Sequence, residues 1–313
     1  MKIDYEALVH SANPDNRILA AENGVGLDIL VNDPVPDVRL AIALQGHRLD
    51  ILANDPDPLV AEAAKYMSYV ESNDYEKRIE AAEHGFGLET LVHDPDSDVR
   101  KTVAKQGYQL DKLISDKNEF VRAEVARQKF KLDVLMKDES WIVRRAVVEQ
   151  NYKLDILIQD EHEHVRHAVA QQGYGLEKLV NDKFWNVRAA VASQGFGLDI
   201  LINDENEDVR LAVAEQGYGL NVFVNDKYWV IRMTVAEQGF GLDVLVHDES
   251  EYVRKAVAQQ GYGLETLISD RHWYVRVAVA EQGYGLDILM NDEDEDVRKA
   301  VESMLKKSKV EGE

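Results

Sequence analysis

Apolar and polar positions follow one another along this chain with a regular period of 22 residues. In the last unit Val297, Ala300 and Val301 fall at helical spacing and form one apolar face. In the unit before it, the corresponding helix leads into a Gln282-Gly283 turn, where glycine suits a left-handed helix end. A short apolar segment, 286–290, comes next and has room for only a turn or two of helix, for which a 3₁₀ helix is one option. Each unit therefore predicts a longer helix, a tight turn and a short second helix.

An arginine marks the repeat unambiguously. It recurs every 22 residues from Arg100 to Arg298, and Arg78 lies in register upstream. A 17-residue step then leads to Ala61, where the arginine is lost, and the proper spacing returns further upstream. We count 14 units. One unit cannot bury its own apolar face, so the units must stack, which predicts an all-α solenoid. We expect a single solenoid domain over residues 1–313.

Two stretches depart from the repeat. The unit at 61–78 lacks the arginine, has Ser68 in place of the turn glycine and is five residues short, and its second segment, 69–71, has lost both leucines. We expect disturbed stacking there, with a kink or a change of curvature. A hinge or docking notch is one interpretation, but a tolerated deletion is favoured because solenoids absorb such changes locally. Residues 305–313 are expected to form a short charged C-terminal tail.

Two polar positions of the unit have expected structural roles. An aspartate stands six residues before most of the arginines, and serine replaces it at Ser11 and Ser72. Aspartate or serine at a helix start accepts hydrogen bonds from the first free amides, so this position is expected to be the N-cap. The residues that follow it in three units are expected at the first helical position: Pro34, Pro56 and Pro95. The fixed Asp–Arg spacing also suits an ion-pair ladder along the stack.

These motifs resemble those of known helical repeats. The aspartate and the arginine six residues later are similar to the HEAT-repeat signature. The fuller combination resembles the leucine-rich repeat variant, on Asp248, Val253, Arg254, Ala256, Val257, Ala258, Leu264 and Leu267. That resemblance implies alternating α and 3₁₀ helices, a right-handed solenoid, and an interaction scaffold that catalyses no reaction. The chain departs from the pattern in its slightly short unit and in lacking the iron–sulfur cysteines known alongside such repeats.

Charge is spread unevenly along the 313 residues, whose net charge is −22. Residues 1–99 and 154–313 carry net charges of −13 and −14, whereas 100–153 hold 13 basic and 8 acidic side chains. Most of the surface should repel nucleic acid and anionic membrane and attract basic partners. The chain has no cysteine and no apolar run of membrane-spanning length, which favours the cytoplasm and leaves no membrane partner to expect.

Tryptophan and glutamate take turns at one position of the repeat. The position holds Trp141, Trp185, Trp229 and Trp273, 44 residues apart, and between them Glu163, Glu207, Glu251 and Glu295. At 100° per residue Trp229 lies about 160° from the apolar-face residue Ile231, so it should project outward. We call the eight residues the Trp/Glu ridge. Exposed aromatic rings among acids suit a basic partner, although each indole could instead pack across the neighbouring helix.

The basic middle of the chain offers a second candidate surface. Two lysines replace the turn glycines of one unit and a third does so one unit later, so all three should lie at one edge of the solenoid: Lys129, Lys131 and Lys153. Lys101 and Lys105 add charge nearby. Such a patch could bind an anionic ligand or nucleic acid. The alternative is an ordinary solvated surface, since a net charge of +5 over 54 residues is modest.

No residue pattern predicts catalysis, a metal or a cofactor. His164 and His167 lie three apart on an expected helix, but no further ligand set accompanies them. Acidic first turns such as 292–296 lack the glycine and the closing glutamate of a calcium loop. We therefore expect a non-catalytic scaffold that binds a protein of basic or mixed charge. The alternatives are a HEAT-like solenoid that binds nucleic acid through 100–153, and an acidic DNA mimic that inhibits a DNA-binding protein.

Overall fold

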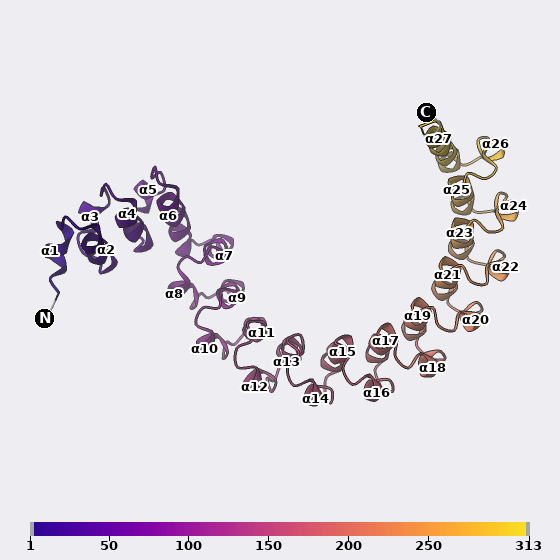
Figure 1. Ribbon diagram of the computed structural model, residues 1–313, viewed down its shortest axis with the longest axis horizontal. Helices are drawn as coiled ribbons and strands as arrows, with labels where there is room; N and C mark the ends of the chain where they lie inside the picture. Colours follow the sequence, from indigo (N-terminus) through magenta and orange to yellow (C-terminus); the bar gives the residue numbers. More distant parts are fainter. Residues whose placement is uncertain (1–2, 311–313) are drawn as a thin grey trace. The chain divides into compact units, whose positions relative to one another are not determined.

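The computed structural model describes residues 3–310, which form 27 α-helices and, within that range, no strand (Figure 1). The chain divides into two compact units, Met1–Tyr152 and Lys153–Glu313, and each is described by itself. Each is a stack of helical repeats, so the predicted all-α solenoid is confirmed. The single domain over 1–313 stays a prediction.

Each repeat of the first unit contributes one long helix, and most add a short one. The long helices are α2 (Pro14–Glu22), α4 (Pro36–Leu44), α6 (Pro58–Val70), α7 (Tyr75–Glu83), α9 (Ser97–Lys105), α11 (Glu119–Arg127) and α13 (Trp141–Val148). The short helices are α1 (Tyr5–Val9), α3 (Leu27–Leu30), α5 (Leu49–Leu52), α8 (Leu88–Leu91), α10 (Leu110–Leu113) and α12 (Leu132–Leu135).

The second unit repeats the alternation without interruption. Its long helices are α15 (Glu163–Gln171), α17 (Trp185–Ser193), α19 (Glu207–Glu215), α21 (Trp229–Glu237), α23 (Glu251–Gln259), α25 (Trp273–Glu281) and α27 (Glu295–Val310). Its short helices are α14 (Leu154–Leu157), α16 (Leu176–Leu179), α18 (Leu198–Leu201), α20 (Leu220–Phe223), α22 (Leu242–Leu245), α24 (Leu264–Leu267) and α26 (Leu286–Leu289). Over residues 3–310 the two units together hold 14 long helices, one for each predicted repeat.

The core is built from the same few positions in successive repeats. On α23, Val253 and Val257 are fully buried, and on α24 the second leucine, Leu267, is 1% exposed. Consecutive long helices pack against each other, α21 against α23 and α23 against α25, so each apolar face is covered by the next repeat. Burying one such side chain stabilises the fold by about 1.5–3 kcal/mol. The fold is therefore stabilised repeat by repeat, through contacts between neighbours.

The short segments are α-helical turns, which differs from the 3₁₀ option and from the 3₁₀ helices that the resemblance implied. In α24 the amide of Leu267 donates to the carbonyl of Gly263 at 3.0 Å, and that of Ile268 donates to Leu264 at 2.9 Å. Both bonds span four residues, as in an α-helix. Gly263 sits in the left-handed region (φ 62°) just before the first leucine and sets the direction of the turn.

The long helices begin two residues later than the sequence indicated, so the expected N-cap is wrong. The N-cap of α11 is Asn118, whose side chain accepts from the amides of Phe120 and Val121, and not Asp116. The one main-chain amide from which the Asp116 side chain accepts a hydrogen bond is that of Asn118, in the turn before the helix. Its carboxylate is otherwise committed to an arginine, so capping passes to the next polar side chain. The expected first-turn prolines likewise lie before their helices (Pro34, Pro56 and Pro95), and the prolines at N1 are Pro14, Pro36 and Pro58.

The irregular unit loses its short helix altogether. Because Ser68 stands where a glycine would end the helix, α6 continues to Val70, and Tyr69 and Val70 belong to it rather than to a second segment. Val70 nevertheless contacts the turn before α8. In other repeats the residue that follows the short helix makes the equivalent contact with the next turn. A Cβ placed on Gly87 would collide with Val70, as one on Gly197 would collide with Val180. The extra turn of α6 thus keeps one contact of the missing helix.

Most of the expected C-terminal tail continues the last long helix. Helix α27 runs to Val310, through most of the range 305–313. The reason is that Met304 and Leu305 stand where Gln-Gly would end the helix. Lys306 and Lys307 then favour its continuation, since cations near the C-terminus complement the helix dipole. The remaining positions, 311–313, lie outside the described residues.

Candidate interaction surface

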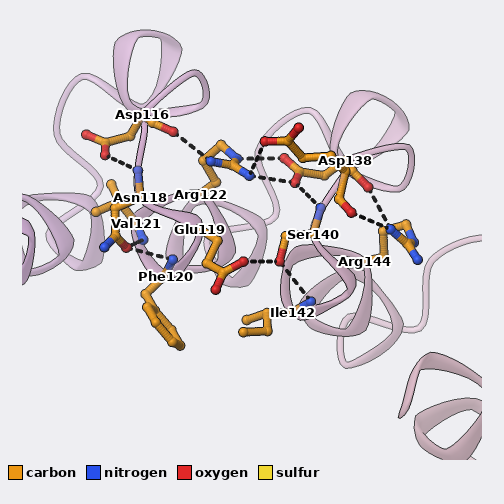
Figure 2. A network of polar contacts seen from close by, with 11 residues as sticks. Asp116, Asn118, Glu119, Phe120, Val121, Arg122, Asp138, Ser140, Ile142 and Arg144 are labelled. Carbon is orange, nitrogen blue, oxygen red and sulfur yellow. Dashed lines mark hydrogen bonds and ion pairs between the residues drawn. The ribbon is translucent and has the colours of Figure 1, made fainter. Parts of the chain in front are cut away.

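An ion-pair ladder fixes one edge of each compact unit. The arginine of one repeat pairs with the aspartate 16 residues later, Nε to Oδ2 at 2.6–2.7 Å and Nη2 to Oδ1 at 2.8–3.2 Å. Figure 2 shows one such pair, Arg122 with Asp138. The remaining nitrogen, Nη1, donates to the main-chain carbonyl of Asp116, six residues before the arginine, at 2.8 Å. Each arginine therefore binds its own repeat and the next.

The paired side chains are nearly enclosed, and hydrogen bonds between them shift the pKa values of pairs such as Arg166 with Asp182. The arginines are 7–13% exposed and the aspartates 4–11%. Burial alone would raise the pKa of Asp182, but the hydrogen bonds from Arg166 and from the amide of Phe184 outweigh it and hold that pKa below its ordinary value. The hydrogen bond to Asp182 likewise raises the pKa of Arg166. Both groups stay charged, and the pair holds adjacent repeats together.

The natural exceptions show what the aspartate is for. Serine replaces it at Ser72, whose preceding repeat has Ala61 in place of the arginine, and at Ser11 in the first repeat of the sequence. Ser72 still accepts from the amide of Asp74 and still offers its carbonyl to Arg78. The side chain is thus an aspartate only where an arginine faces it. The expected ion-pair ladder is confirmed.

All eight residues of the Trp/Glu ridge occupy the first position of a long helix. In the second unit the indoles are accessible: Trp185 is 45% exposed, Trp229 39% and Trp273 38%. Trp141, in the first unit, is half-buried. Two of the ridge glutamates contact neighbouring side chains: Glu295 pairs with Lys299 at 2.9 Å, and Glu251 lies 3.9 Å from His272. Whether this ridge binds a partner stays a prediction.

Aromatic rings join two of these tryptophans into one surface. The Trp229 ring stacks on Tyr252 with 4.7 Å between centroids, and Tyr252 meets the edge of Tyr274 at 6.0 Å. Trp273 lies 5.4 Å from Tyr274 and stacks on His272 at 6.0 Å. We call these five residues, carried by α21, α23, α25 and the turn before α25, the aromatic surface. Each of its tryptophans both packs on a neighbouring aromatic ring and keeps about two fifths of its surface exposed.

Sequence reasoning missed part of this surface. Tyr252 and Tyr274 directly follow the Glu and Trp positions, but no 44-residue period marks them, so the alternation did not single them out. It also missed the exposed acids beside the ladder. Glu249 is 86% exposed and places Oε1 3.3 Å from Nη2 of Arg232, and Glu205 and Glu293 hold the same place in other repeats. Their signal was their position, directly after the ladder aspartate.

The basic residues are only partly brought together. Lys129 and Lys131 are both exposed and adopt left-handed backbone conformations (φ 59° and 43°) in the turn between α11 and α12. Lys105 is exposed at the end of α9, whereas Lys101 is half-buried and pairs with Asp98 at 3.0 Å. Lys153 has the same left-handed conformation (φ 51°) but belongs to the second unit, so its expected clustering with the other two stays a prediction.

The described part of the chain has neither a cluster of metal ligands nor a helix that could cross a membrane. Among residues 3–310 no group of three or more His, Asp or Glu side chains is placed to hold a metal ion. His162 instead caps α15, its Nδ1 accepting from the amide of His164 at 3.3 Å. Over the same range no helix is both long enough and apolar enough to cross a membrane.

The chain was compared with known families, curated proteins and solved structures. No protein-family model matches the chain, and no curated protein matches it. Among solved structures, the crystal structure of an engineered protein is similar over 96% of this chain and 97% of that one, with 16% sequence identity and a TM-score of 0.23. A TM-score this low carries no inference about shared shape or function.

Proposed function

We propose that this chain is a non-catalytic scaffold that binds a protein partner of basic or mixed charge through the Trp/Glu ridge of its second unit. The observation that carries the proposal is the aromatic surface, which runs without a break over three successive repeats, from Trp229 to Trp273. Tryptophan and tyrosine dominate the binding energy of protein interfaces because they bury large areas at little conformational cost. Few features of a repetitive acidic stack otherwise set one region apart.

The surroundings favour a cationic segment of the partner. Residues 154–313 hold 16 basic and 30 acidic side chains, which attracts basic partners over a range of about 10 Å at 0.1 M salt. Lys255 already places its Nζ 3.7 Å from the centroid of Tyr274, so a ring of this surface accepts a cation. A lysine or arginine of the partner would gain the same contact on the exposed face of Trp229 or Trp273.

A pull-down from cell extract tests the proposal with two matched double variants. Trp229→Ala with Trp273→Ala should lose a partner that the unchanged chain retains. Tyr218→Ala with Tyr262→Ala should keep it, because those rings are equally exposed (41% and 42%) but lie in the glycine turns. Circular dichroism checks that both variants fold. A partner list unchanged by the tryptophan substitutions would refute the proposal.

Nucleic-acid binding is the second candidate, supported by the conformations of Lys129 and Lys131. A non-glycine residue in the left-handed region costs on the order of 1 kcal/mol, and such cost is often retained for function. Lys129→Gly with Lys131→Gly restores the usual turn residues and should not impair folding. Duplex DNA titrated at two salt concentrations should bind the unchanged chain in a salt-dependent manner and bind this variant more weakly.

The repeat itself fits the family that its motifs resemble. The leucine-rich repeat variant supplies the nearest pattern, with the HEAT signature at the aspartate and the arginine, and both are associated with interaction scaffolds. The short segments of this chain are α-helical, whereas those of the leucine-rich repeat variant are 3₁₀ helices. Membership of this chain in that family is therefore a proposal. It supports binding rather than catalysis.

A further inference from the structure

The short helix missing from the irregular unit leaves a cavity in the layer of short helices. In Figure 1 a short helix accompanies each neighbouring long helix, α5 on one side and α8 on the other, but none follows α6 before α7. The cavity measures about 640 Å³. It is lined mainly by the ends of α4 and α6, the starts of α5 and α8 and the turn before α8, including Leu44, Leu49, Met67, Val70, Phe86 and Leu88. We call it the α6 notch.

Two residues that line the notch are apolar at positions that hold polar residues in most other repeats. Leu44 is 46% exposed and stands where most other repeats have a charged or polar residue, such as Glu215. Met67 lies in the next unit, at the following position of the repeat. That position is a glutamine in every repeat from Gln106 to Gln282. A leucine at this position occurs only at Leu44, and methionine replaces the glutamine at Met67 and again only at Met304, in the last repeat. The deletion is thus accompanied by local side-chain changes that a tolerated deletion alone does not require.

The walls of the notch are fixed before anything binds. Tyr66 is 7% exposed and stacks on His84 and Phe86, with centroids 4.0 and 5.5 Å away. Its hydroxyl also lies 2.9 Å from Nε2 of His84. These contacts hold α6 against α7 and the turn that follows it. A site formed in advance binds more tightly than one that must be ordered on binding.

We propose that the α6 notch binds a short amphipathic helix of a partner protein, bearing two leucines spaced as Leu-x-x-Leu and a flanking basic residue. The occupant would take the place of the missing helix. Elsewhere in this chain that place is filled by such a segment, whose first leucine is half-buried and whose second is buried, as in Leu110 and Leu113. Acidic side chains line the notch, Glu71 and Glu89, and among its lining residues none is basic, so a lysine or arginine beside the leucines is favoured.

The probe is a fluorescein-labelled peptide with the sequence of residues 108–117, YQLDKLISDK, which carries Leu110, Lys112 and Leu113. Titrated with the full chain and followed by fluorescence anisotropy, it should bind with a dissociation constant of about 10–500 µM, as two buried leucines of a flexible peptide allow. The same peptide with alanine at both leucines should bind at least tenfold more weakly. Absence of binding of the leucine peptide at about 2 mM chain would overturn the proposal.

Two variants of the chain place the peptide in the notch. Leu44→Glu with Met67→Gln restores the polar residues of the regular repeat and should weaken binding at least tenfold while the fold stays intact. Replacing residues 67–71 by a copy of residues 45–54 restores the 22-residue spacing and supplies the missing helix in the chain itself, so the peptide should no longer bind. Equal affinity for the unchanged chain and for either variant would overturn the proposal.

This inference is independent of the proposed function. The aromatic surface belongs to the second unit and the notch to the first. Trp229→Ala with Trp273→Ala should therefore bind the peptide as the unchanged chain does. Absence of peptide binding would refute the notch proposal without affecting the proposed function. A pull-down that shows no tryptophan-dependent partner would refute the proposed function without affecting the notch proposal.

Discussion

Replacing one ladder aspartate by serine should cost far more than its surface position suggests. Asp270 accepts from Nε and Nη2 of Arg254 at 2.6 and 2.9 Å, and both side chains are 7% exposed. Serine can keep the bond from the amide of His272, as Ser72 does for its own turn, but it cannot neutralise the guanidinium. Asp270→Ser therefore leaves an enclosed charge with only main-chain carbonyls as acceptors, those of Asp248 and Glu249.

The expected loss of stability follows from the arginine charge that stays buried after the substitution. Removing one partner of a buried ion pair costs about 3–5 kcal/mol. We expect about 3 kcal/mol for Asp270→Ser, since Arg254 keeps its carbonyl contacts. Arg254→Ala with Asp270→Ser reproduces the natural combination of Ala61 with Ser72 and leaves no charge behind. That double variant should be more stable than Asp270→Ser alone, with a coupling between the two sites of about 1.5 kcal/mol or more.

Native-state hydrogen exchange provides the assay, because stacked repeats open locally and a single unfolding free energy is not defined for a long array. The amides of Val275 and Leu267, on either side of the pair, report the opening of α25 from α23. Urea unfolding followed by tryptophan fluorescence gives a second readout, as Trp273 lies three residues from the substitution. A loss below about 1 kcal/mol for Asp270→Ser, or single-variant losses that simply add in the double variant, would refute the reasoning.

Three further predictions test other parts of the structure. Several ladder aspartates have pKa values below their ordinary range in the folded chain and therefore bind fewer protons than in the unfolded chain, among them Asp116, Asp182, Asp204, Asp226 and Asp270. Their stabilisation is complete above about pH 5 and should be lost as the pH falls through 4 towards the lowered pKa values, which a decreasing urea midpoint would show. Gly263→Ala should destabilise more than Gly261→Ala, because both are left-handed but only a Cβ at 263 would lie 2.6 Å from Cγ2 of Val246; equal melting temperatures would contradict this. Asn118→Ala should cost about 1 kcal/mol by removing the cap of α11, whereas Asn225→Ala, at an exposed residue without a capping role, should leave the midpoint unchanged.

The repeat and its core could be predicted from sequence because their positions are fixed by period alone. Val253, Val257 and Leu267 recur every 22 residues, and residues at helical spacing on one face are buried wherever repeats stack. The role of the aspartate could not be read from spacing in the same way. Asp248, six residues before Arg254, suits a helix cap, but the partner it finds in space is Arg232 of the preceding repeat. The serine at Ser72 carried that information, since the preceding repeat has Ala61 in place of the arginine.

The candidate surfaces were harder to predict because they depend on contacts between repeats. The 44-residue alternation located the Trp/Glu ridge at one position of the unit, and the structure places all eight residues at a helix start. It could not show that Tyr252 and Tyr274 bridge Trp229 and Trp273, because ring contacts follow from the stacking distance and not from the period. The α6 notch was visible only as a deletion, and its shape depends on how far α6 continues once the glycine is absent.

The regular residues of the unit have little capacity left for binding. The arginine and the aspartate satisfy each other, the valines and leucines are covered by the next repeat, and over residues 3–310 no buried side-chain nitrogen or oxygen lacks a hydrogen-bond partner. A partner can therefore gain specific contacts only where a repeat differs from its neighbours. In this chain those places are the aromatic surface, the lysine-bearing turn at 129–131 and the α6 notch. Each can be returned to the regular repeat by a few substitutions or one insertion, so recognition and folding can be tested separately in the same molecule.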